Sequence, residues 1–412
     1  RPGRQTKSYG LAFDVGTTTI AGYLCELESG MVVRTVSAMN PQVKYGEDVV
    51  SRISYHMGNP DGLERMSADL ITTINGLIEE AVNSSGAQIE SDIDKPHIPL
   101  IRSDDIVDVA MCSNTAMHHI LLELDPEPLG VIPFTPSIHH SIDMKCRDLG
   151  LIVNEAAHLF FLPSVAGYVG GDTIGVMLAE TPQDSEEMQL IIDIGTNGEL
   201  VLGNRDKLIC SSCATGPALE GAQIEFGMRA APGAIERIKI DQDSLEVDYK
   251  VIGRKAWKAY SAPGEMKTRG ICGSGIIDAV GELLLSGIVS KGGAFSTKAT
   301  SSKRFREHPE TGMKEYVLAW ADETSIGMDI VVTQKDVRQI QMAKASIYTG
   351  SKLMMKHMGI THLDKIKIAG AFGTHIDKNL AREIGLIPDC RPETVTSVGN
   401  AAGDGCRAAL LN

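Results

Sequence analysis

The stretch that decides the fold spans residues 193–200 and reads DIGTNGEL. This stretch comes after an apolar run, and the chain is expected to turn at its Gly-Thr pair. A shorter copy, DVGTT, occupies residues 14–18, and in both copies a second apolar run comes after the turn. This pattern predicts a β-hairpin with an aspartate at the bend. One such turn would be weak evidence, because turns of this composition are common, but two copies behind buried-type strands predict a pair that clamps one nucleotide.

The residues of each turn suit phosphate binding. Glycine lets the backbone approach a ligand closely, and consecutive N–H groups of a turn can converge on an anion. The aspartate would repel a phosphate, so its natural partner is a hydrated Mg²⁺. We therefore predict magnesium sites at Asp14 and Asp193, reached through bound water. We also predict nucleotide contacts from the turn residues that follow: Gly16, Thr17, Thr18, Gly195, Thr196 and Asn197.

The composition is that of a globular protein with two domains or lobes. The 412 residues are too many for one ordinary core, and 43% are apolar while 22% are charged. A formal charge of −14 without a basic stripe argues against nucleic acid as a partner. No apolar run is long enough for a membrane span or a signal peptide. Eight scattered cysteines fit a reducing compartment, so we expect a cytoplasmic protein.

Strand-like and helix-like stretches alternate along the chain, which predicts an α/β fold. The strands that open each lobe are expected at 9–14, 18–27 and 31–38, and again at 189–193, 199–202 and 207–211. The acidic, turn-rich segment 181–188 is the best boundary between the lobes. We therefore expect a first lobe over 9–180 and a second over 181–412, with a last helix at 399–410 that returns to the hinge.

Five motifs in order resemble those of the actin-like ATPase superfamily, which includes acetate and sugar kinases, heat-shock chaperones and actin. They are a first phosphate motif at 14–18, a connection at 164–172, a second phosphate motif at 193–197, an adenosine motif at 369–373 and a second connection at 398–405. The resemblance implies two ribonuclease-H-like lobes with ATP and Mg²⁺ in a cleft between them. It also implies that four residues of the adenosine motif pack on the nucleotide: Gly370, Ala371, Phe372 and Gly373.

Asp172, in the first connection, has two interpretations. As a catalytic acid beside Asp14 and Asp193, it would orient the water that attacks ATP. As a helix-start residue, it would only bond its own backbone. The sequence leaves both interpretations open.

A narrower resemblance is to the reductive activators of corrinoid proteins. It rests on LAFDVGTTT at 11–19, NPQ at 40–42 with YGED at 45–48, GPALEG at 216–221 and GICGSG at 270–275, and it extends over the whole chain. It implies that ATP is used while an inactive Co(II) corrinoid returns to Co(I). It also adds four nucleotide neighbours: Gly216, Glu220, Gly273 and Ser274.

The same resemblance implies partners beyond the nucleotide. They are a corrinoid protein, an electron donor, and an upstream ferredoxin-like domain with a two-iron cluster. The four-cysteine pattern of such a domain, C-x₄-C-x₂-C with a distant fourth cysteine, does not occur in this sequence. We therefore expect the polar segment 1–8 to be the linker from a cluster domain that lies upstream of Arg1.

Two other functions remain open. A small-molecule kinase of the same superfamily would share both hairpins. An activator of a 2-hydroxyacyl-CoA dehydratase or benzoyl-CoA reductase would hold a four-iron cluster between two subunits. Cys210 and Cys213 form the one C-x-x-C, and a homodimer would bring together four such thiols. Packed thiols beside the active cleft are the simpler interpretation.

Overall fold

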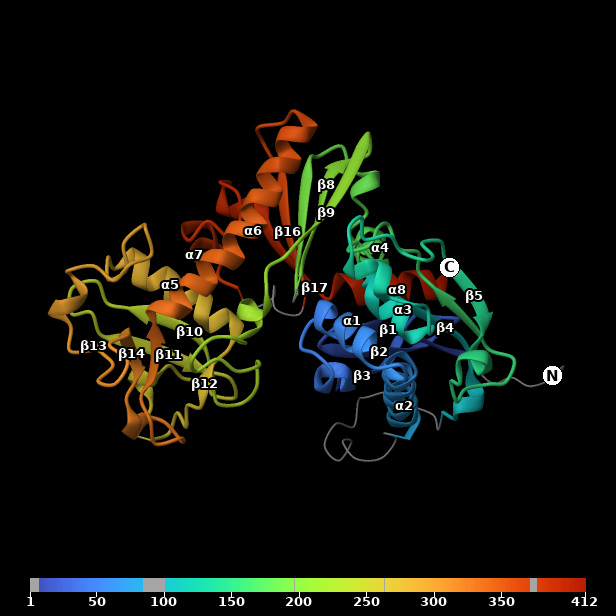
Figure 1. The fold of residues 1–412 in the computed structure, drawn as a ribbon, viewed down its shortest axis with the longest axis horizontal. Coiled ribbons are helices and arrows are strands. Elements are labelled where there is room, and N and C mark those ends of the chain that lie inside the picture. Colours follow the sequence, from blue (N-terminus) through green and yellow to red (C-terminus); the bar gives the residue numbers. More distant parts are fainter. Residues whose placement is uncertain (1–6, 84–100, 196, 263, 371–375) are drawn as a thin grey trace. The chain divides into compact units, whose positions relative to one another are not determined.

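The computed structural model describes residues 7–83, 101–195, 197–262, 264–370 and 376–412. They form two compact units, which we name unit 1 and unit 2 (Figure 1). Unit 1 contains the chain up to Asp184 together with Asn400–Asn412, whereas unit 2 contains Ser185–Gly399. The sequence analysis placed the boundary at 180 and assigned the last helix to the second lobe. In the structure this helix belongs to unit 1, because its buried face packs on the first strands of the chain.

Unit 1 is built on a mixed six-stranded sheet with the order β3-β2-β1-β4-β6-β5. The expected trio of antiparallel strands is confirmed, and β4 and β6 extend the sheet parallel to β1. The short β5 pairs antiparallel with β6 and was not predicted. The strands are β1 (Tyr9–Val15), β2 (Thr19–Glu26), β3 (Val32–Met39), β4 (Ile106–Ser113), β5 (Ile142–Lys145) and β6 (His158–Phe161).

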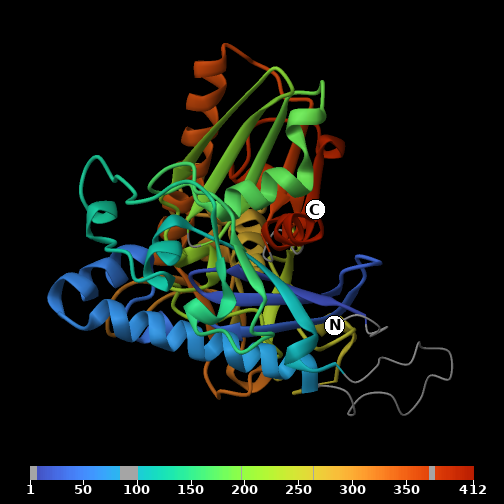
Figure 2. The ribbon, with the colours of Figure 1, turned by 90° about the vertical axis from the view of Figure 1, so that its right-hand side faces the viewer.

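Helices cover both faces of this sheet. The long α2 lies on one face and α8 lies with α4 on the other (Figures 1 and 2). The apolar residues of α2 that recur at helical spacing are buried in the unit 1 core: Met66, Leu70, Ile74, Leu77, Ile78 and Ala81. The helices are α1 (Val49–Gly58), α2 (Gly62–Asn83), α3 (Thr115–Leu121), α4 (Gly171–Glu180) and α8 (Ala401–Leu411).

The helices α4 and α8 approach each other through glycine. A Cβ atom on Gly405 would lie 1.7 Å from the carbonyl oxygen of Gly175, and one on Gly175 would lie 2.6 Å from that of Ala402. Real Cβ atoms do not come so close to backbone, so neither position has room for a side chain. The small residues of α4 therefore allow it to pack closely on α8.

Unit 2 repeats the same plan around a five-stranded sheet with the order β17-β16-β7-β8-β9. An antiparallel trio, β7 to β9, is again extended by parallel strands beside its first member. The strands are β7 (Gln189–Ile194), β8 (Gly198–Asn204), β9 (Lys207–Cys213), β16 (Lys365–Ala369) and β17 (Val395–Gly399). The predicted amphipathic helix α6 (Gln334–Met358) packs on β8 and β9, so the duplicated hairpin of the sequence corresponds to a duplicated fold.

The rest of unit 2 contains two three-stranded sheets, β11-β10-β12 and β13-β14-β15. The strands β13, β14 and β15 were not predicted from the sequence. The elements are β10 (Ala234–Ile240), β11 (Val247–Val251), β12 (Gly270–Ile271), α5 (Gly273–Leu285), β13 (Phe305–Glu307), β14 (Lys314–Ala319), β15 (Ile330–Thr333) and α7 (Lys378–Glu383). Across the described ranges, no helix has the length and apolar character needed to cross a membrane.

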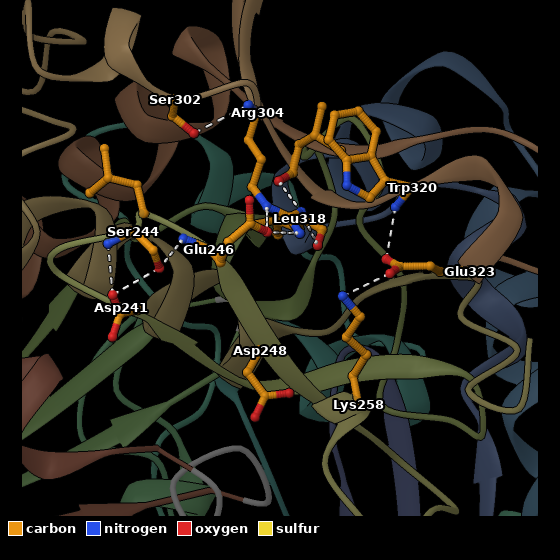
Figure 3. Close-up of polar contacts among 12 residues, drawn as sticks. Asp241, Ser244, Glu246, Asp248, Lys258, Ser302, Arg304, Leu318, Trp320 and Glu323 are labelled. Atoms are coloured by element: carbon orange, nitrogen blue, oxygen red, sulfur yellow. Dashed lines mark hydrogen bonds and ion pairs between the residues drawn. The ribbon is translucent and has the colours of Figure 1, made fainter. Parts of the chain in front are cut away.

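A buried arginine joins these smaller sheets (Figure 3). The side chain of Arg304 is 1% exposed and donates to one carboxylate oxygen of Glu246 through Nε at 2.9 Å and Nη2 at 2.7 Å. Its Nη1 donates to the carbonyl oxygens of Val317 and Leu318 at 3.1 and 3.2 Å, and the guanidinium lies 5.3 Å from the Trp320 ring centre. The guanidinium therefore satisfies buried carbonyls that no apolar side chain could satisfy.

Replacing this arginine should destabilise unit 2. Arg304→Met removes the donors to two carbonyls, which should lower the free energy of unfolding by about 3 kcal/mol. Urea unfolding followed by tryptophan fluorescence measures unit 2 specifically, because both tryptophans, Trp257 and Trp320, lie in it. The matched control is Arg205→Met, which breaks an exposed pair with Glu186 and should cost less than about 1 kcal/mol. Equal losses in the two variants would contradict the role of the buried arginine.

Candidate functional site

In unit 1 the predicted residues gather where three parallel strands end. The strands β1, β4 and β6 run in the same direction, so their carboxyl ends lie along one edge of the sheet. The turn Gly16–Thr18 follows β1, Asn114 follows β4, and the segment after β6 leads to Asp172 in the first turn of α4. In α/β sheets, ligands bind outside the carboxyl ends of the strands.

Protein donors hold the turn Gly16–Thr18 from one side. Asn40 donates its side-chain Nδ2 to the carbonyl oxygen of Gly16 at 2.8 Å and its backbone N–H to that of Thr18 at 2.9 Å. The Nη2 of Arg52 donates to the carbonyl oxygen of Thr17 at 2.6 Å, and Asn114 Nδ2 donates to the Thr17 hydroxyl at 2.9 Å. The turn is therefore fixed before any ligand arrives.

This arrangement orients the other side of the turn for an anion. A trans peptide is planar, so its N–H points opposite to its C=O. Because the carbonyls of Gly16 and Thr17 point toward protein donors, the N–H groups of Thr17 and Thr18 face the opposite way. Gly16 also has to lack a side chain, since a Cβ would lie 2.6 Å from the carbonyl oxygen of Thr19. The phosphate nest at this turn stays a prediction, which the orientation of these N–H groups supports.

Asp14 lies beside Asp172 in unit 1, and both side chains are half-buried. Burial and the Asp172 charge raise the pKa of Asp14 to about 7, against hydrogen bonds from Asn400 and Cys112. Burial raises the pKa of Asp172 to about 6, although Thr173 N donates to its Oδ1 at 2.7 Å. Asp172 thus bonds its own helix start and also faces a second carboxylate, so the structure accommodates both interpretations.

The two carboxylates fit a divalent cation. Burial is the main cause that makes the ionised form of both acids costly, and a hydrated Mg²⁺ would favour that form. Mg²⁺ keeps several waters and takes few carboxylates plus substrate phosphates. Asp14 is therefore the unit 1 residue that could hold it, with Asp172 as a second acid of the same site.

The raised pKa of Asp14 predicts a pH-dependent stability. With a folded pKa of about 7 and an unfolded value near 3.9, the folded protein binds more protons between about pH 4 and 7, so rising pH destabilises it there. Asp14→Asn removes this dependence of the free energy of unfolding on pH. The variant should gain stability relative to the wild type between pH 5 and 7, by at most about 1.4 kcal/mol per pH unit, when unfolding is measured in a chelator.

The control for this measurement is Asp148→Asn, which removes a 59% exposed carboxylate from the same unit. Added Mg²⁺ and ATP should favour ionised Asp14 and remove the pH trend of the wild type. A difference between wild type and Asp14→Asn that stays constant from pH 5 to 7 would show that Asp14 is not held in a costly ionised state.

In unit 2 the second hairpin has a comparable setting. Asp193 lies on β7 opposite Glu199 and beside Ala369 of the parallel strand β16. Gly195 N donates to the carbonyl oxygen of Asn197 at 3.0 Å, which closes the turn. Gly370 follows β16 with a φ of +91°, and a Cβ there would lie 2.9 Å from Asp193 Oδ1. The structure therefore brings together Asp193, Gly195, Asn197 and Gly370.

The remaining predicted residues of unit 2 lie in a second group. Gly216 and Glu220 flank a short turn that contacts α5, and Gly273 and Ser274 form the first turn of α5. Ser274 is buried and its hydroxyl lies 3.3 Å from the Cys272 thiol, so it contributes to the internal packing of this helix. The role of all four residues in nucleotide binding stays a prediction.

Some sequence predictions cannot be placed. Thr196, Ala371, Phe372 and Gly373 lie outside the described residues, as do positions 1–6 of the expected linker. In the part of the chain that the structure describes, no three His, Cys, Asp or Glu side chains come together as a metal-binding group.

The C-x-x-C pair lies on a strand. Cys210 and Cys213 are three positions apart on β9, so their side chains leave opposite faces of the sheet. Within one chain they therefore cannot bind the same metal. A cluster shared between two chains stays untested.

Asn40, Arg52 and Asn114 were not among the predicted site residues. Asn114 caps α3, since its side chain accepts from Met117 N, and the same side chain also donates to the Thr17 hydroxyl. Asn40 opens the NPQ motif, which marked the family resemblance but gave no hint of a contact with the turn. Arg52 left no signal, because an arginine in an amphipathic helix is ordinarily exposed.

The comparisons agree with this architecture. Residues 9–184 match a family described as the RACo middle region, and residues 187–412 match the C-terminal domain of RACo, the ASKHA domain. A solved structure of a reductive activator for corrinoid, iron-sulfur protein has a TM-score of 0.83 and 36% identity, and it covers 99% of this chain and 61% of that one. The fold is thus that of an actin-like ASKHA protein, and the predicted α/β class is confirmed.

Two curated relatives extend this result. The corrinoid activation enzyme RamQ of Eubacterium limosum is 38% identical over 98% of this chain and 64% of its own length. A [Co(II) methylated amine-specific corrinoid protein] reductase of Methanosarcina barkeri is 24% identical over 92% of this chain and 66% of its own. The chain belongs to the RACo family and spans a little under two thirds of the length of these relatives.

Proposed function

We propose that this chain binds MgATP and forms the ATP-dependent part of a reductive activator that returns a Co(II) corrinoid protein to Co(I). The observation that carries the proposal is the meeting of Asp14, the turn Gly16–Thr18 and Asp172 at the carboxyl ends of parallel strands. Family membership supports the choice of partner, because the similar proteins are activators or reductases of corrinoid proteins.

In unit 1, Asp14 would hold Mg²⁺ and the turn Gly16–Thr18 would bind phosphate. In unit 2, Asp193 and the turn residues after it would do the same. When bound, Mg²⁺ neutralises phosphate charge. Asp172 orients the attacking water, while the nucleoside contacts come from Gly370 with residues 371–373 and from the group Gly216, Glu220, Gly273 and Ser274.

ATP can assist the reduction only by changing the relative stability of the Co(II) and Co(I) states of the partner. For a one-electron couple, a tenfold change in equilibrium corresponds to about 59 mV. A ligand shifts an equilibrium only through its different affinity for the two states. We therefore infer that bound nucleotide changes the affinity of this chain for the Co(II) and Co(I) forms of its partner. The electron comes from an iron-sulfur domain, which we place upstream of this chain, and from its donor.

The test measures binding in two steps. Calorimetry with MgATP and MgADP should show binding to the isolated chain, with slow hydrolysis of ATP. The affinity for a corrinoid protein in its Co(II) state is then measured with ATP, with ADP and without nucleotide. Three equal partner affinities would rule out the coupling. The chain alone should not reduce the corrinoid, and the same chain fused behind a two-iron ferredoxin domain should do so with ATP.

The two alternative functions give different results in the same assays. A small-molecule kinase would transfer phosphate to a sugar or carboxylic acid without any dependence on a corrinoid protein. A dehydratase activator would purify anaerobically as a coloured dimer with four irons. Either result would contradict the proposed function.

A further inference from the structure

Arg52, in α1, carries a fully buried charge. Its side chain is 0% exposed, and it donates to four acceptors in unit 1. They are Thr17 O at 2.6 Å, Gly46 O at 3.0 Å, Gln42 Oε1 at 3.3 Å and Met117 Sδ at 3.1 Å. None of these acceptors is a carboxylate, and among the described residues Asp48 is the acid whose charge acts on the guanidinium.

Such a charge is costly for the fold. Burial of an ion without a paired counter-ion costs several kcal/mol, even when hydrogen bonds satisfy its protons. Burial lowers the pKa of Arg52 to about 10, so the guanidinium stays charged at neutral pH. A neutral donor would serve the four acceptors at lower cost, which indicates that the positive charge itself is used.

The position of the guanidinium indicates that use. Its shortest contact is to the carbonyl of Thr17, the central residue of the turn between β1 and β2. Arg52 therefore lies on one side of the turn, and the N–H groups of Thr17 and Thr18 point to the opposite side. An anion on that side would feel an unpaired positive charge through one peptide unit, in a setting that water screens poorly.

We propose that Arg52 is a positioning residue that fixes the turn Gly16–Thr18 through Thr17 and supplies it with a permanent positive charge, so that the turn selects polyphosphates without any direct contact between arginine and ligand. This inference rests on the proposed function, since it assigns the phosphates of MgATP to that turn. Gln42 and Asn40 belong to the same support, which explains the NPQ motif at 40–42.

Two variants separate the charge from the hydrogen bonds. Arg52→Met removes both, and it should weaken MgATP binding at least about tenfold while adenosine binding is unchanged. Gln42→Glu keeps Arg52 and places a carboxylate at the acceptor that now lies 3.3 Å from its Nη1, so the charge is compensated locally. It should also weaken MgATP binding about tenfold. Because Gln42 Nε2 also donates to the carbonyl oxygen of Met66 at 2.9 Å, Gln42→Met is measured beside it; this variant loses the same donor without adding charge and should keep its affinity for MgATP within about twofold.

The control is Arg65→Met, which removes the same charge from a 59% exposed arginine of unit 1. It should leave both affinities within about twofold. Calorimetry with MgATP, pyrophosphate and adenosine gives the required comparison, and thermal unfolding checks that each variant is folded. Gln42→Glu remains decisive if Arg52→Met does not fold.

Two outcomes distinguish this inference from the proposed function. Suppose that wild-type protein binds MgATP, and that folded Gln42→Glu binds both MgATP and pyrophosphate with the affinity of the wild type. The charge role of Arg52 is then wrong, and the proposed function stands. If wild-type protein binds neither MgATP nor pyrophosphate, the proposed function fails and the inference fails with it. A purely structural role of Arg52 would give Gln42→Glu and Gln42→Met the same affinity for MgATP.

Discussion

Asp14→Asn should lower the rate of ATP hydrolysis by about a hundredfold and leave the protein folded. The substitution keeps the size of the side chain and removes the charge that the proposed Mg²⁺ site requires. Burial raises the pKa of this carboxyl group to about 7, and a bound cation would favour its ionised form. Loss of a group that stabilises charge in a closed site typically costs two to three orders of magnitude in turnover.

The measurement is steady-state phosphate release with saturating MgATP, together with a melting curve. Asp193→Asn tests the second hairpin in the same assay and should give a loss of similar size. Asp148→Asn is again the matched control and should stay within about twofold of wild type. Hydrolysis by Asp14→Asn within threefold of wild type, with normal folding, would remove Asp14 from the proposed site.

Gly405→Ala should destabilise unit 1 by about 3 kcal/mol, although it adds only one methyl group. The new Cβ would lie 1.7 Å from the backbone oxygen of Gly175. Backbone cannot rotate away as a side chain can, so α4 and α8 must separate. Their movement would displace Asp172, at the start of α4, and Asn400, which caps α8 and bonds Asp14. ATP hydrolysis should therefore fall as well.

Hydrogen exchange of the β1 and β2 amides measures this loss, because both tryptophans of the protein lie in unit 2. The matched control is Gly76→Ala, an exposed position in α2 at which a Cβ would meet nothing within 4 Å. There alanine should stabilise the helix by about 0.5–1 kcal/mol. Unchanged exchange in Gly405→Ala would mean that the two helices tolerate separation.

The sequence predicts the fold of each central sheet well, for a physical reason. Apolar runs that end at Asp-x-Gly-Thr turns satisfy the local requirements of a strand and of its turn at once, so β1, β2, β7 and β8 are found where they were expected. The strands β13 to β15 carry no such local signal. Arg306, Glu307, Lys314 and Glu315 place charges on both sides of a short loop, which hides the hairpin. The contact that fixes this hairpin to the rest of unit 2 joins Arg304 to Glu246, which is distant in sequence.

The candidate site shows the same limit. Asp14 and the turn after it are visible in the sequence because their chemistry is local. The residues that hold that turn are not visible in the sequence. Asn114 reaches Thr17 from almost a hundred residues away, and Arg52 looks like an ordinary surface residue of its helix. A buried charge is defined by its surroundings, so only the three-dimensional structure reveals it.

The place of α8 also has a consequence for biosynthesis. Its residues complete the core of unit 1, where Cys406 Sγ donates to the carbonyl oxygen of Phe13 at 3.4 Å. The ribosome makes the first strands of unit 1 and then the whole of unit 2 before it makes this helix. Unit 2 can therefore close its core first. The nascent unit 1 must wait with its α8 groove open, and during this interval it depends most on chaperones.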